Sequence, residues 1–240
     1  MIGDRKTIMN APAIDISQDS VARALRGFGP AGVMSLLVIL LAGNISVNRL
    51  PVVPIGATLA LLWAWRSRTP WRDLGLARPK SWVGTLIVGL LFGVGLKLVM
   101  KAVVMPIFDA PPLNPTYQFL TGNGGLLPLA IWAMVVAGVS EEIVFRGFLF
   151  ERARALFGRS LKATIGFVIV TSLWFGLIHY FNQQWPGVQQ AVVFGAIFAT
   201  ILVRTGNVWM LMVAHVAFDL TALAIIYLGL EAAVAQLFFA

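Results

Sequence analysis

The chain lacks cysteine altogether and carries little charge: none of its 240 residues is Cys, and only 12% are Asp, Glu, Lys or Arg. The lack of cysteine excludes a disulfide scaffold, a thiol nucleophile and a cysteine-ligated zinc or iron–sulfur centre. The low charge excludes an intrinsically disordered chain. With 59% hydrophobic residues and a mean hydropathy of +0.85, the chain has more apolar surface than one soluble core of this size can hide. The composition therefore predicts an integral membrane protein.

Seven apolar segments follow a polar N-terminal stretch, and each is close to the ~20 residues with which a helix crosses ~30 Å of hydrocarbon. We therefore expect an all-α, polytopic membrane protein with about seven transmembrane helices. The predicted helices cover residues 30–46, 51–65, 82–105, 126–150, 163–180, 188–203 and 208–228. The predicted organisation is a cytoplasmic N-terminal tail (1–28), N-terminal transmembrane helices and loops (29–125), a helical core (126–228) and a C-terminal tail (229–240).

The 18 Lys and Arg residues predict how the chain is oriented. Fourteen lie in the N-terminal tail and in alternate connections, whereas the connections on the opposite side hold Arg49 alone. Because Lys and Arg are enriched in cytoplasmic loops, we expect the N-terminus inside and the C-terminus outside, in a membrane of the bacterial cytoplasmic type. The net charge of +8 does not indicate a nucleic-acid partner, since no basic stretch is interleaved with aromatic residues.

The other three cations, Lys97, Lys101 and Arg146, lie within apolar segments. Lys97 and Lys101 are one helical turn apart, so we expect them to balance buried acids in a polar cavity. For Lys101 the alternative is a side chain that extends toward the membrane surface.

Five further ionisable residues lie at hydrocarbon depth, where each charged group costs roughly 2.5–3.5 kcal/mol on insertion scales and usually has a function. Glu142 and Arg146 are four residues apart and can pair, while Glu141 is rotated by about 100° from Glu142. Glu141 is therefore the acid available as a general base; the alternative is an ion pair that only orders the helices. The five residues are Glu141, Glu142, His179, His215 and Asp219.

The two histidines of the chain lie on different apolar segments. His215 and Asp219 share one helix face, which suits two metal ligands, a histidine oriented by a carboxylate, or a pair that only fixes helix register. His179 on its own is as typical of a hydrogen bond between helices. If segments 126–150, 163–180 and 208–228 pack around one cavity, two imidazoles and a carboxylate activate water there, directly or through a divalent metal. The predicted reaction is hydrolysis inside the membrane.

Three motifs in this order resemble the signature motifs of the CPBP intramembrane proteases, which include the CAAX prenyl endopeptidases of the Rce type and the bacterial Abi proteins. They are Glu-Glu-x-x-x-Arg at residues 141–146, Phe-x-x-x-His at residues 175–179 and His-x-x-x-Asp at residues 215–219. The resemblance implies an endopeptidase that hydrolyses peptide bonds of membrane-associated or CAAX-like substrates, including lipidated ones. Its partners would be the bilayer and a peptide or protein substrate; the residues indicate no oligomeric state.

The resemblance also implies a role for each residue. Glu141 and His179 would activate the water, and Arg146 would anchor Glu142. His215 and Asp219 would stabilise the oxyanion, orient other groups or bind a metal. Candidate ligands of a divalent metal, zinc first, are His179, His215 and Asp219; a metal-free glutamate mechanism stays equally open.

Two other functions remain open at this stage: a non-enzymatic scaffold or bacteriocin-immunity protein that keeps the motifs, and an ion- or proton-coupled transporter that uses them as a relay. The predicted helix bounds also contain one conflict. They place Glu141 nearer the cytoplasmic side and His179 nearer the outside, so the two residues differ in depth. Convergence of the two residues therefore requires helices longer, deeper or more tilted than predicted.

Overall fold

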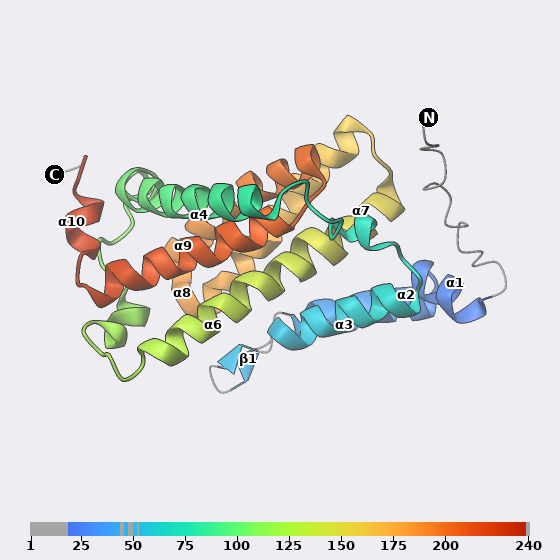
Figure 1. Ribbon diagram of the computed structural model, residues 1–240, viewed down its shortest axis with the longest axis horizontal. Helices are drawn as coiled ribbons and strands as arrows, with labels where there is room; N and C mark the ends of the chain where they lie inside the picture. The colour runs from blue at the N-terminus through green and yellow to red at the C-terminus, as the bar shows by residue number, and fades with distance from the viewer. Residues whose placement is uncertain (1–18, 44–45, 48–49, 52, 239–240) are drawn as a thin grey trace, which may run out of the picture.

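The computed structural model describes residues 19–43, 46–47, 50–51 and 53–238, and these are predominantly helical (Figure 1). Most of the predicted N-terminal tail lies outside the described residues. The α-helices are α1 (Ser20–Arg26), α2 (Pro30–Ala42), α3 (Val53–Arg66), α4 (Trp82–Val99), α5 (Met105–Ile107), α6 (Leu127–Glu141), α7 (Phe150–Phe157), α8 (Leu161–Thr205), α9 (Trp209–Tyr227) and α10 (Glu231–Ala235). Two 3-10 helices, η1 (Trp71–Leu74) and η3 (Pro115–Leu120), and two π-helices, η2 (Met100–Val104) and η4 (Glu142–Leu149), complete the helical part. A short antiparallel ladder joins β1 (Ser46–Val47) to β2 (Leu50–Pro51).

The end of the predicted tail is packed against α3. Asp19 caps α1 by accepting a hydrogen bond from the Ala22 N–H, and it also accepts from Arg66 and Arg68 at the end of α3. The Ala22 N–H, and after it the two arginines, hold the pKa of Asp19 below its usual range. Helix α1 is therefore fixed to α3 and is not a free tail.

Within the described residues, four helices are long and apolar enough to cross a membrane, or up to five if the bent pair α1–α2 is one span. They are residues 82–107, 127–157, 161–205 and 209–227. The prediction of an all-helical, polytopic membrane protein is thus confirmed, whereas the count of seven spans is not. Helices α2 and α3 have only 13 and 14 residues, or about 20 Å, which is short for ~30 Å of hydrocarbon.

The second reason for the lower count is helix α8, which contains two predicted spans. The backbone at Gln184 has φ 55° and ψ −161°, and Pro186 follows, so the helix turns there. A Cβ on Gly176 would meet Val192, and one on Gly195 would meet Ser172. The rings of Phe175 and Phe194 stack with centroids 6.0 Å apart. These contacts show that the predicted segments 163–180 and 188–203 are antiparallel arms of one hairpin.

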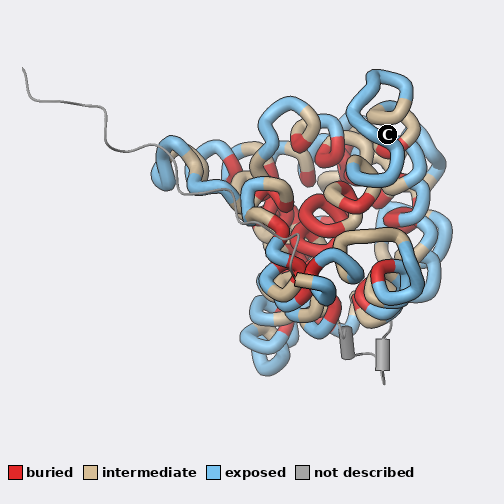
Figure 2. The backbone as a smooth tube through the Cα atoms, turned by 90° about the vertical axis from the view of Figure 1, so that its right-hand side faces the viewer, coloured by how far each residue is buried: buried red, intermediate tan, exposed pale blue. Residues whose placement is uncertain are grey.

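Helix α9 lies between α4 and α6 (Figure 1) and packs closely against both. A Cβ on Gly93 of α4 would collide with the Ala214 carbonyl, and one on Gly138 of α6 would lie 3.1 Å from the Val216 backbone nitrogen. Such close approach is typical of small residues between membrane helices. Buried residues gather at the centre of the bundle (Figure 2), while large apolar side chains such as Leu91 and Trp132 are exposed outside, as expected of a surface that faces lipid.

Candidate active site

The first predicted motif lies where α6 passes into the π-helix η4. π-Helical turns are rare and often occur at functional sites. Nearly every side chain of η4 is buried, including Glu142 and Arg146. Arg146 Nη1 donates to Glu142 Oε1 at 3.0 Å, so the ion pair predicted from their spacing is present. The Arg146 guanidinium also lies over the Phe175 ring, 4.4 Å from its centroid.

His215 of α9 meets the same glutamate. Its Nδ1 lies 2.8 Å from Glu142 Oε1, so Glu142 accepts from the imidazole as well as from Arg146. A carboxylate at Nδ1 fixes the tautomer and orientation of a histidine. The sequence pattern did not reveal this contact, because 73 residues separate the two side chains.

The other nitrogen of His215 faces two more predicted residues. Nε2 lies 3.8 Å from Glu141 Oε2 and 3.7 Å from Asp219 Oδ2. These gaps are too long for direct hydrogen bonds and suit a bridging water. Among the described residues, Glu141 Oε2 has no hydrogen-bond partner although it is buried. Because a buried carboxylate oxygen without a partner is costly, this atom is suited to receive a proton or a hydrogen bond from water or substrate.

His179 reaches this cluster through an aromatic ring. Its Nδ1 lies 2.7 Å from the Phe175 carbonyl oxygen of the same helix. The Phe175 ring contacts both imidazoles, with its centroid 4.6 Å from His179 and 6.3 Å from His215. The structure thus brings Glu141, Glu142, Arg146, His215 and Asp219 together directly, and it adds His179 across Phe175.

The predicted conflict in depth was an error of helix bounds. The helical rod that carries Glu141 continues to Phe157, seven residues beyond its predicted end, and α8 begins at Leu161. Glu141 is therefore 16 residues from this end of the bundle and His179 is 18, a difference in depth of only a few ångströms. The two residues lie at similar depth, as a shared site requires.

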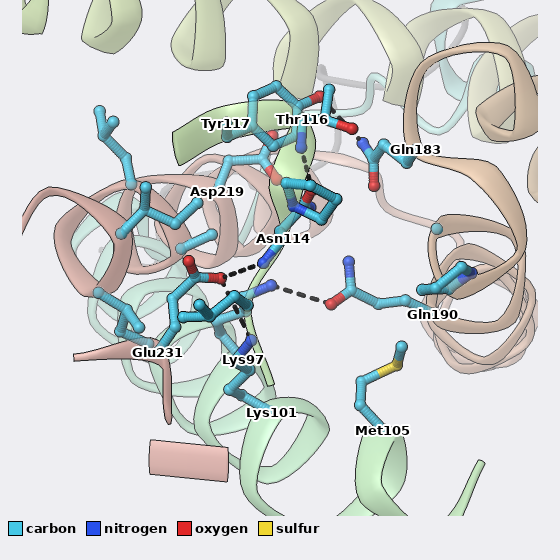
Figure 3. Close-up of a pocket in the computed structure, with 18 of the residues that line it drawn as sticks. Lys97, Lys101, Met105, Asn114, Thr116, Tyr117, Gln183, Gln190, Asp219 and Glu231 are labelled. Atoms are coloured by element: carbon cyan, nitrogen blue, oxygen red, sulfur yellow. Dashed lines mark hydrogen bonds and ion pairs between the residues drawn. The ribbon is translucent and has the colours of Figure 1, made fainter. Parts of the chain in front are cut away.

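A cavity of about 360 Å³ opens beside Asp219 (Figure 3). Lys97 Nζ donates to Gln190 Oε1 at 2.9 Å, and no carboxylate of the described residues lies within 4.0 Å of it. Lys101, in contrast, pairs with Glu231 at 3.2 Å and donates to a backbone carbonyl. The expected polar cavity is present, and Lys101 is buried instead of extending to the surface.

Glu231 is a residue of this cavity that the sequence pattern missed, because it lies in the predicted C-terminal tail. It is buried and accepts from Lys101, from the Asn114 backbone N–H at 3.1 Å and from Gln118. A signal did exist: Glu231 is the one acid after the last apolar segment.

Residues 123–221 match a family model described as type II CAAX prenyl endopeptidase Rce1-like. This part, 99 of the 240 residues, is similar to that family and is termed the Rce1-like domain. It contains all six predicted site residues, and the family is one of proteases, which supports an endopeptidase acting in a membrane. No curated protein and no solved structure matches the chain. Lys97, Lys101 and Glu231 complete the cavity from outside the Rce1-like domain.

The side chains of the Rce1-like domain do not form a ready metal site. Within the described parts of the chain, no group of three or more His, Asp or Glu side chains is arranged to hold a metal ion. His215 and Asp219 face each other, whereas His179 lies across the Phe175 ring from His215. The hydrogen bond between its Nδ1 and the Phe175 carbonyl leaves Nε2 as the possible ligand atom. The predicted ligand set of His179, His215 and Asp219 is therefore not assembled in this arrangement.

Proposed function

We propose that the protein is an intramembrane endopeptidase that hydrolyses peptide bonds of membrane-associated, CAAX-like substrates. The observation that carries this proposal is the cluster of Glu141, His215 and Asp219, whose side-chain atoms approach within 3.8 Å beside a cavity. The match of residues 123–221 to a prenyl endopeptidase family supports the same reaction.

Glu141 is the proposed general base. Its unpartnered Oε2 takes a proton from a water molecule, and the water oxygen attacks the substrate carbonyl carbon. The carbon–nitrogen bond then breaks, and the proton on Glu141 passes to the leaving amine. Both parts of the water molecule are accounted for: its hydroxyl stays on the new carboxyl group, and its proton leaves with the amine.

The two histidines and Asp219 assist this step. Glu142 holds His215 with Nε2 toward the water position, and Arg146 neutralises Glu142. Asp219 orients His215 or the water, since an ionised carboxylate accepts hydrogen bonds and cannot donate one to an oxyanion. The family resemblance gives His179 a share in activating the water, and its place across Phe175 at similar depth supports a contact with substrate.

The cavity beside Asp219 is the proposed binding site for the end of the substrate. A CAAX-like protein is cut close to its free C-terminus, and the buried ammonium of Lys97 is a suitable partner for the terminal carboxylate. The Phe218 ring and the apolar lining of the cavity suit the side chains that precede it.

The deciding experiment uses two variants of the acid and imidazole that face each other. Glu141→Gln and His215→Ala are expected to lower the cleavage rate of a farnesylated CAAX peptide in nanodiscs by about 10²–10⁴-fold, because they remove the proton acceptor or its partner. Glu151→Gln, an equal change in a glutamate paired with Arg152 outside the site, is the control. Wild-type rates in both folded site variants would refute the proposal and would favour a scaffold; substrate flux without cleavage would favour a transporter.

A metal-dependent form of the reaction is tested separately. Metal content is measured on the purified wild-type protein and on His215→Ala. Stoichiometric zinc that the variant loses would establish a metal site. Full cleavage by metal-free protein would assign the chemistry to the side chains alone.

We also propose that the chain crosses with the N-terminus inside and the C-terminus outside, with the arms of α8 and helices α2 and α3 as membrane segments. In support, the connection 66–81, with five Lys or Arg residues, meets the connection 204–208, which holds Arg204. Asn207 Nδ2 donates to the Ala77 carbonyl, and the Val208 N–H donates to the Gly75 carbonyl. Because the natural chain has no cysteine, Arg78→Cys and Asn123→Cys provide single labels. An impermeant maleimide added outside is expected to label position 123 alone; the reverse pattern would invert the topology.

A further inference from the structure

A second cavity, also of about 360 Å³, lies at the opposite end of the bundle, where α7 is labelled in Figure 1. Its lining is dominated by arginine and includes a single acid, Asp73. Three separate parts of the chain contribute to it: η1 with Gly75, the stretch from η4 through α7 to Arg159, and the end of α8 with the turn before α9. The arginines are Arg72, Arg146, Arg154 and Arg159.

The positive charge of this cavity is only partly compensated. Arg146 is paired with Glu142, and Asp73 lies 3.9 Å from Arg72. No carboxylate of the described residues lies within 4.0 Å of the side-chain nitrogens of Arg154 or Arg159. Asp73 acts electrostatically on Arg154, but neither Arg154 nor Arg159 forms an ion pair within the described residues, so the cavity keeps a net positive charge that favours an anionic occupant.

The walls of the cavity are held in place by contacts between distant parts of the chain. The Val208 N–H donates to the Gly75 carbonyl at 3.0 Å, which ties the turn after α8 to the end of η1. A Cβ on Gly147 would lie 3.3 Å from the Leu74 carbonyl, so η1 also packs closely on η4. The Arg154 guanidinium lies over the Phe150 ring, 4.5 Å from its centroid. The arginines therefore surround a built cavity and are not a chance group on one loop.

The chemistry of the lining selects phosphate. Guanidinium groups bind phosphate oxygens through paired, charge-assisted hydrogen bonds. The cavity lies at the cation-rich end of the bundle, and basic pockets between helices on the cytoplasmic side are typical sites for phospholipid headgroups. We propose that this cavity binds a phosphate group, presented there by an anionic membrane phospholipid.

This site has a physical connection to the proposed active site. Arg146 lines the cavity and also donates to Glu142, which in turn holds His215. An anion in the cavity lies close to the group that fixes the position of the imidazole. The inference does not depend on the proposed hydrolysis, because phosphate binding is measured without substrate.

The test is a titration of the full-length protein in neutral detergent, followed by its melting temperature. Short-chain phosphatidylglycerol is expected to raise Tm in a saturable way, because a ligand that binds only the folded state stabilises it. Arg154→Gln with Arg159→Gln is expected to weaken the apparent affinity at least about tenfold. Arg78→Gln with Lys80→Gln removes the same charge from exposed positions outside the cavity, and it is expected to leave the affinity unchanged.

Short-chain phosphatidylcholine and inorganic phosphate distinguish the source of the ligand. A shift with phosphatidylglycerol alone supports the lipid. An equal shift with inorganic phosphate that requires Arg154 and Arg159 supports the phosphate site with a soluble ligand. If the double variant does not fold, Arg72→Gln, whose side chain is 79% exposed, replaces it and is expected to weaken binding severalfold. No saturable shift in the wild type, or one that survives loss of the cavity arginines, overturns the proposal.

Discussion

Lys97→Met is the sharpest test of how the cavity beside Asp219 recognises substrate. Lys97 is buried, donates to Gln190 at 2.9 Å and lies 4.7 Å from the centroid of the Phe218 ring. Met keeps the length and apolar stem of lysine and removes the charge. The variant is therefore expected to fold, since an unpaired buried ammonium stabilises a membrane bundle little and costs desolvation.

The size of the effect follows from the contact that is lost. A hydrogen bond to a charged group contributes about 1.5–3 kcal/mol. Loss of the one between Lys97 and a terminal carboxylate therefore corresponds to roughly 10- to 150-fold in kcat/KM. The loss should be confined to substrates that carry that carboxylate.

The assay compares two farnesylated CAAX peptides that differ only at the C-terminus, one a carboxylate and the other a carboxamide. The wild type is expected to prefer the carboxylate by roughly 10- to 150-fold, and Lys97→Met is expected to cleave both at similar rates. Lys162→Met, the same change at an exposed position, should keep the wild-type preference. An equal preference in wild type and Lys97→Met, with both proteins folded, would refute the role of Lys97 while leaving the protease proposal intact.

Three further predictions concern stability, measured as Tm or free energy of unfolding in detergent. Gly93→Ala should cost about 1–3 kcal/mol of stability, because the new Cβ would collide with the Ala214 carbonyl. The control Gly95→Ala, whose Cβ would meet no atom within 4 Å, should be neutral or stabilising. Equal effects of the two changes would contradict the close packing of α9. Glu231→Gln should cost about 3–5 kcal/mol because it leaves Lys101 buried without its partner, and an unchanged Tm would argue against a buried pair. Gln184→Gly should stabilise the protein by up to about 2 kcal/mol. The backbone strain at this positive φ is worth about 1–3 kcal/mol, and its relief exceeds the entropic cost of glycine. A lower Tm would show that the Gln184 side chain stabilises the turn.

The sequence predicted those parts of the site that depend on local spacing. Glu142 and Arg146 pair as helix geometry requires, and His215 and Asp219 share a face of α9. The contact between Glu142 and His215 could not be predicted in this way, because it depends on how α6 and η4 pack against α9. The π-helix η4 could not be predicted from the hydropathy pattern either, because that pattern does not distinguish a π-helical turn from an α-helical one.

Helix ends were the weaker part of the prediction. The apolar pattern stops at Phe150, yet the helix continues because Arg152, two residues on, is used inside the protein. Arg152 is buried, donates to the Arg26 carbonyl at 2.7 Å and lies over the Trp63 ring. The hydrogen-bond partner of Arg152 is 126 residues away in the sequence, so the sequence alone does not reveal it. A polar residue at this position therefore predicts the start of a loop.

The close packing of α9 between α4 and α6 has a consequence for how a substrate enters the cavity beside Asp219. Helix α9, which carries His215 and Asp219, packs backbone against backbone on α4 and α6, so it has no space in which to move. The opposite rim of the cavity is different: η3 and α10 are joined there by hydrogen bonds from the Asn114 backbone N–H and the Gln118 side chain to the carboxylate of Glu231. We therefore expect substrate to enter between η3 and α10, because only hydrogen bonds to Glu231 have to part there, whereas a movement of α9 would have to separate closely packed backbone.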